Sequence, residues 1–189
     1  MQHDKIIKSV RHWLEKVVIA LNLCPFAKRE LNNNRIRFTV TEVATEQQLL
    51  EILQTELAFL NDNVSIETTL LIHPKVLQDF HDYNEFLDAA DGLLIDMELE
   101  GIYQIASFHP NYQFADTAPE DVENYTNRSP FPLLHILRED SLAKAIANYP
   151  DSDKIPEHNI ALLQRLGLKK MQALYQSHFE TIKEIDGER

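Results

Sequence analysis

Apolar residues recur along the chain with two different periods, and the change between them predicts the elements. They recur at every third or fourth position over residues 4–22, 45–61, 75–99 and 132–148. That spacing is typical of helices with one buried face. Residues 45–48 read Thr-Glu-Gln-Gln, which is a capping box and predicts the start of the second of these helices.

Three shorter segments have the character of strands. Residues 35–43 alternate between apolar and polar, and residues 64–72 and 102–108 end in apolar residues. Strand–helix–strand units normally hold parallel strands with right-handed crossovers. We therefore expect an α/β fold with a small, mostly parallel sheet of three to four strands that helices cover. An α+β fold with an antiparallel pair is the alternative.

The segment Tyr-Pro-Asp-Ser-Asp at residues 149–153 interrupts this pattern. Proline among small polar residues is typical of a break between elements. From residue 156 the helical period returns, and Gly167 is expected to divide the last region into two helices. The sequence predicts an α/β core with the N-terminal helix over residues 1–150, and a helical C-terminal extension over residues 151–189 that packs on it.

A repeated His-Pro pair is the most informative motif. One predicted strand ends in Ile-His-Pro at residues 72–74 and another in Phe-His-Pro at residues 108–110. Parallel strands would bring His73 and His109 to the same edge of the sheet, where ligands of open α/β sheets bind. Imidazoles suit acid–base catalysis and metal binding. The two histidines are candidate catalytic residues, and an equally good interpretation is that they are polar strand ends.

The long segment after His109 holds the candidate substrate-binding residues. Arg128 is the first Lys or Arg after Lys75, and its guanidinium could bind a carboxylate or a phosphate through two hydrogen bonds. An ion pair with an acidic neighbour, such as Asp116, Asp121 or Glu123, is the alternative. The other candidate binding groups are the hydroxyl of Ser129, the amide of Asn111, the aromatic ring of Tyr125 and the guanidinium of Arg138.

Cys24 is a third catalytic candidate. If Pro25 begins a short helix, the thiol lies at its N-terminus near Lys28 and Arg29, and its pKa falls. A small, buried apolar residue is the alternative. With His73, His109 or His135, Cys24 could also bind zinc, and two histidines with a carboxylate could bind iron. The spacing of these residues matches no short zinc motif.

Composition excludes several classes of function. The net charge of −12 argues against nucleic acid as a partner. No apolar run has the length of a membrane span, the first residues lack a secretory signal pattern, and one cysteine allows no internal disulfide, so we expect a cytoplasmic protein without a membrane partner. The four glycines do not cluster, and no motif for a nucleotide cofactor is present.

Four segments together resemble a known family. They are LNLCPFA, TTLLIHP, FHPNYQFAD and NYTNRSPFPLLHILRE. The chain is similar over roughly residues 5–178 to the family catalogued as domain of unknown function 1415. The resemblance implies that these segments belong together in one protein, but it implies no activity, cofactor or catalytic residue.

The sequence thus predicts an enzyme that acts on a small anionic metabolite at a Cys/His/Arg cleft beside the strand ends. One alternative is a protein that binds zinc or iron. The other is a non-catalytic interaction module whose long loop docks a partner.

Overall fold

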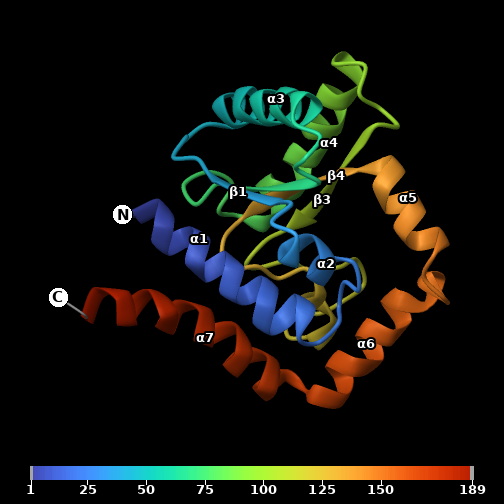
Figure 1. The fold of residues 1–189 in the computed structure, drawn as a ribbon. Coiled ribbons are helices and arrows are strands. Elements are labelled where there is room, and N and C mark those ends of the chain that lie inside the picture. Colours follow the sequence, from blue (N-terminus) through green and yellow to red (C-terminus); the bar gives the residue numbers. More distant parts are fainter. Residues whose placement is uncertain (1, 188–189) are drawn as a thin grey trace.

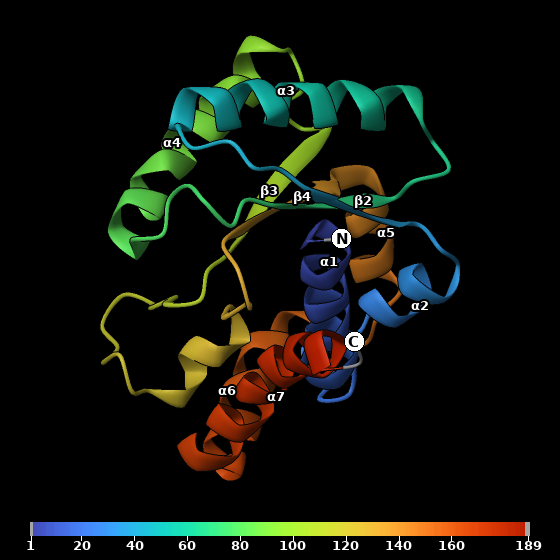
Figure 2. The ribbon, with the colours of Figure 1, turned by 90° about the vertical axis from the view of Figure 1, so that its left-hand side faces the viewer.

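The computed structural model describes the backbone of residues 2–187 and the side chains of residues 2–177. A single sheet lies between two layers of helices (Figures 1 and 2). Helices α3 and α4 cover one face, and α1, α2 and α5 lie on the other. α7 packs along α1, and α6 packs against α7 and the segment Val122–Thr126. The helices are α1 (Gln2–Trp13), α2 (Ala27–Asn32), α3 (Glu46–Asp62), α4 (Phe80–Asp96), α5 (Glu139–Ala147), α6 (Ile155–Leu166) and α7 (Leu168–Gly187).

The sheet has the strand order β1-β2-β4-β3. Its strands are β1 (Ile36–Val40), β2 (Thr68–Ile72), β3 (Tyr103–Phe108) and β4 (Leu133–Arg138). β1 and β2 pair in parallel, whereas β4 is antiparallel to both β2 and β3. The α/β character is as expected, but the prediction of a mostly parallel sheet was wrong. Because β4 is reversed relative to both neighbours, β1, β2 and β3 still point in the same direction.

The prediction of one helix over residues 132–148 was wrong. The first part of this segment forms β4 and only its second part forms α5. β4 is a central strand, so Leu133 packs on the α1 side of the sheet while Leu134 and Ile136 pack on the α3 side. A short run that is apolar on both faces has no period to distinguish a strand from a helix.

Other helix boundaries follow local capping chemistry. The predicted start of α3 is confirmed, because the backbone N–H of Gln48 donates to the Thr45 hydroxyl at 3.3 Å. The helix expected over residues 75–99 begins later, at Phe80, because the Asp79 side chain caps it. α4 is continuous through Gly92.

Two apolar cores fill the two sides of the sheet. The core under α3 and α4 includes Leu53, Leu71 and Tyr83, and the core on the other face includes Trp13 and Leu70. The second core also takes in Leu163 of α6 and Met171 of α7. Gly167, with a φ of 76°, separates these two helices as predicted. Within residues 2–187, none of the helices combines the length and the apolar composition needed to cross a membrane.

Candidate functional site

The two His-Pro pairs lie at the same edge of the sheet, as predicted. Ile72 at the end of β2 and Phe108 at the end of β3 both pair with Leu133, the first residue of β4. His73 and His109 follow directly and are both fully buried. Both rings lie beside that of Tyr83, with centroid distances of 5.9 and 5.1 Å to its ring.

Hydrogen bonds to one loop hold both imidazoles. Nδ1 of His73 donates to the carbonyl oxygen of Val76 at 3.1 Å, and Nε2 of His109 donates to that of Leu77 at 3.2 Å. Nδ1 of His109 accepts from the backbone N–H of Asn111 at 3.0 Å. A carbonyl can only accept, so these bonds fix the tautomer of each ring. The pair therefore anchors the loop between β2 and α4.

Burial keeps both rings neutral. It lowers the pKa of His73 to about 4 and also lowers the pKa of His109. Neither ring has a surface open to solvent from which it could meet a substrate. The geometry supports the structural interpretation of the His-Pro repeat.

Arg128 holds the long loop that precedes it. Its Nε donates to the carbonyl oxygen of Tyr112 at 3.2 Å and its Nη2 to that of Pro119 at 2.7 Å. Its guanidinium carbon lies 4.7 Å from the centroid of the Tyr125 ring. Within residues 2–177, no ion pair joins Arg128 to the acidic neighbours considered from the sequence. Ser129 is buried, and its hydroxyl donates to the carbonyl oxygen of Phe131 at 2.7 Å.

The other candidate binding residues also have structural contacts. Asn111 is exposed and contributes its backbone N–H to His109. The guanidinium of Arg138 donates to the Tyr103 hydroxyl at 2.9 Å and to the carbonyl oxygen of Leu60 at the end of α3. It lies on the α3 side of the sheet, whereas His135 lies on the α1 side. Side chains alternate between the two faces along a strand, and residues 135 and 138 are three positions apart, so these two side chains point to opposite faces.

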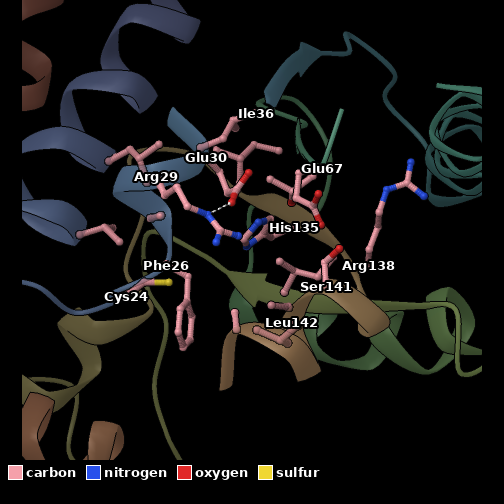
Figure 3. Close-up of a pocket in the computed structure, with 18 of the residues that line it drawn as sticks. Cys24, Phe26, Arg29, Glu30, Ile36, Glu67, His135, Arg138, Ser141 and Leu142 are labelled. Carbon is pink, nitrogen blue, oxygen red and sulfur yellow. Dashed lines mark hydrogen bonds and ion pairs between the residues drawn. The ribbon is translucent and has the colours of Figure 1, made fainter. Parts of the chain in front are cut away.

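The face of the sheet toward α1 carries a cavity of about 270 Å³. Figure 3 shows its lining, which comes from the sheet, the α1 and α2 regions and α5. The lining is mainly apolar and includes Trp13, Phe26, Leu70, Phe108 and Leu142. Pockets that bind small molecules are usually concave and mainly apolar, with a few polar groups that orient the ligand. This cavity is therefore the candidate site.

His135 is the titratable ring that faces this cavity. It lies in the middle of β4, between Leu70 of β2 and Ala106 of β3. Burial lowers its pKa to about 4, so the imidazole is neutral at pH 7. The ring lies beside that of Phe108, with centroids 6.0 Å apart and the two planes tilted by 51°. Among the described residues it has no hydrogen-bond partner, whereas His73 and His109 each bond a backbone carbonyl. Nε2 of His73 also lacks a partner, but that ring is fully buried and does not line the cavity.

Four charged residues gather at one end of the cavity. Glu30 and Glu67 line it, and Arg35 forms ion pairs with both carboxylates. The Nε of Arg29 donates to Oε1 of Glu30 at 2.7 Å, as the dashed line in Figure 3 marks. Arg138 also contributes to the lining, but Figure 3 shows its guanidinium pointing away from the cavity.

Cys24 lines the same cavity, but its position relative to α2 and the pKa of its thiol differ from the prediction. α2 begins at Ala27 with Phe26 as its N-cap, so Cys24 lies outside the helix. Burial raises the pKa of the thiol, although hydrogen bonds from the backbone of Phe26 and Ala27 oppose the rise. The thiol is therefore protonated at neutral pH, and the prediction of a lowered pKa was wrong.

The metal candidates do not gather at one place. His73 and His109 lie at the strand ends, whereas Cys24 and His135 line the cavity. Over residues 2–177, no group of three or more His, Cys, Asp and Glu side chains is arranged to hold a metal ion.

Residues 5–173 match the family described as "Protein of unknown function (DUF1415)". The chain belongs to this family. No curated protein and no solved structure matches it. The matched range includes the His-Pro edge and every residue that lines the cavity, so both features lie within the part of the chain that defines the family.

The sequence singled out Cys24, His135 and Arg138 but missed the other residues that line the cavity. Trp13, Glu30 and Glu67 come from three separate segments, and each fits a simpler local explanation, as an apolar helix position or as a surface charge. An acidic residue directly before an apolar strand, as at Glu67, was the available signal.

Proposed function

We propose that this protein binds a small, mainly apolar molecule in the cavity on the α1 face of the sheet. In this proposal, His135 is the residue that exchanges a hydrogen bond or a proton with that molecule. The supporting observation is that His135 lines the cavity, whereas His73 and His109 are fully buried outside it. Backbone carbonyls occupy His73 and His109, whereas His135 faces the cavity without a partner.

An unpaired polar group in an apolar environment has a free-energy cost, and buried polar groups are normally hydrogen-bonded. His135 is half-buried and its ring nitrogens are not among the sealed, unpaired atoms, so a ligand that displaces water from the cavity would have to supply a hydrogen bond to the ring in its place. The neutral imidazole offers one donor and one acceptor nitrogen. It suits both orientation of a ligand and acceptance of a proton during a reaction.

The sequence led us to expect a Cys/His/Arg cleft beside the strand ends. We now propose a Cys/His/Arg site in the cavity, which keeps Cys24 but has a different histidine and a different arginine. Cys24, His135 and Arg29 line the cavity, whereas Arg128 is held by its own loop. The protonated Cys24 thiol contributes a polarisable surface rather than a ready nucleophile. We also propose a cytoplasmic location, because a single free thiol fits a reducing compartment.

Binding can be measured with the uncharged fluorescent probe N-phenyl-1-naphthylamine. Trp13 is the sole tryptophan of the chain and lines the cavity, so energy transfer from Trp13 reports binding there. Ala145 lines the cavity from α5, and Ala145→Phe should weaken binding at least tenfold by filling it. Ala143 is exposed on the same helix, and Ala143→Phe is the matched control.

The proposal predicts binding to the parent protein and to Ala143→Phe, and weak binding to Ala145→Phe, with cooperative thermal unfolding in all three. Equal binding to both variants would place the probe elsewhere and contradict the proposal.

A further inference from the structure

Two carboxylate oxygens at the charged end of the cavity lack hydrogen-bond partners. Oε2 of Glu67 pairs with Arg35, but its Oε1 is buried and accepts no hydrogen bond among the described residues. Oε2 of Glu30 is also buried without a hydrogen bond, and its ion pair with Nη1 of Arg35 is 3.4 Å long. A ligand with hydrogen-bond donors could therefore pair with these two carboxylate oxygens.

Exposure decides the sign of the local electrostatic potential. The Glu30 and Glu67 side chains are 9% and 11% exposed, whereas Arg35 and Arg29 are 35% and 68% exposed. Formally the four charges cancel, but water screens exposed charges far more than buried ones. The carboxylates consequently dominate inside the cavity, and an anion would be repelled there.

The apolar part of the cavity suits the same class of ligand. The aromatic rings of Trp13, Phe26 and Phe108 line it. Aromatic rings attract organic cations through their negative faces and also pack against apolar groups. Aromatic walls and unpaired carboxylate oxygens together are complementary to an ammonium group on an apolar body.

We propose that the ligand of the cavity is a small organic amine, bound as the ammonium ion, whose nitrogen donates to Glu67 and Glu30 while its apolar body lies between the aromatic rings and His135. This inference rests on the proposed function, since it names the class of molecule that the same cavity takes. It differs from the anionic substrate that the sequence suggested, and it gives Glu67 and Glu30 the selecting role.

The test uses three probes that share a phenyl ring and differ in their polar group: 2-phenylethylamine, 2-phenylethanol and phenylacetate. Each would displace N-phenyl-1-naphthylamine from the full-length protein at pH 7. We expect the amine to displace the probe at a concentration at least tenfold below that of the alcohol, with phenylacetate the weakest.

Glu67→Gln should remove most of the preference for the amine while leaving the alcohol unchanged. Glu30→Gln should lower the preference in the same direction, and it is the second test if Glu67→Gln fails to fold. Glu51→Gln is the control, because it removes a carboxylate that is exposed on α3, on the far side of the sheet.

The outcomes separate the two proposals. If the alcohol or phenylacetate displaces the probe as well as the amine does, or if Glu51→Gln acts like Glu67→Gln, the amine inference is overturned and the cavity remains a binding site. If N-phenyl-1-naphthylamine itself does not bind the parent protein, the proposed function fails, and the amine inference fails with it.

Discussion

His73 and His109 bind consecutive carbonyl groups of the same loop, those of Val76 and Leu77. The two histidines come from different strands, so their hydrogen bonds tie the ends of β2 and β3 to the entry of α4. Leu77 has a φ of 57°, in the left-handed region that costs a leucine about 1–2 kcal/mol. The bond from His109 fixes the carbonyl of this strained residue.

Removal of either ring should destabilise the protein without acting on the cavity. His73→Ala and His109→Ala each delete a buried ring and leave a carbonyl unpaired, which together cost roughly 2–4 kcal/mol. Urea unfolding followed by Trp13 fluorescence measures this loss. His81, which is exposed on α4, gives the control His81→Ala. A variant with unchanged stability and no probe binding would instead support the catalytic interpretation of the pair.

Stability should fall as the pH falls from about 6.5 toward 4. His73 has a pKa of about 4 in the folded state and about 6.5 when unfolded, so the unfolded chain binds the proton first. Its stabilising contribution is complete above pH 6.5 and is lost below it, by roughly 3 kcal/mol at most. The free energy of unfolding at pH 6.5, 5.75 and 5 measures the slope. The lowered pKa values of His135 and His109 contribute slopes of the same sign, so His73→Gln should reduce the slope without abolishing it. An equal slope in that variant would contradict the assignment.

Strand direction explains which features of this edge the sequence could predict. The His-Pro repeat was predicted to meet at one edge, and it does, because β1, β2 and β3 run the same way. The reversed strand between them was missed, since Leu133 to Leu137 is buried on both faces. The cavity was missed because it joins the α1 and α2 regions, β4 and α5, and its shape depends on packing that no local pattern encodes.

Tyr83→Phe should weaken the junction between β3 and β4. The Tyr83 hydroxyl donates to the carbonyl oxygen of Leu133 at 2.8 Å and accepts from the backbone N–H of Phe108 at 3.0 Å. Its loss leaves two buried backbone groups unpaired, at a cost of about 1–3 kcal/mol. Tyr149 packs edge-on against Phe26, and Tyr149→Phe is a control in which no described hydrogen bond of the hydroxyl is lost. Equal stability of the two variants in urea would refute this role.

Arg128→Ala should loosen the long loop and spare ligand binding. The guanidinium holds the carbonyls of Tyr112 and Pro119, so its removal should increase proteolysis between residues 111 and 126 severalfold. Limited proteolysis with mass spectrometry locates the cuts, and Arg165→Ala, at an exposed position of α6, is the control. Cleavage equal to that of the parent protein would contradict this role of the guanidinium.

We propose that His135, and not the His-Pro pair, meets the ligand. The most direct test is to record the imidazole nitrogen resonances of ¹⁵N-histidine-labelled protein at pH 7 while N-phenyl-1-naphthylamine is added, with His73→Gln, His109→Gln and His135→Gln used for assignment. We predict a neutral His135 ring whose nitrogens shift on saturation, while those of His73 and His109 stay in place. Shifts at His73 or His109 with an unchanged His135 would contradict the account.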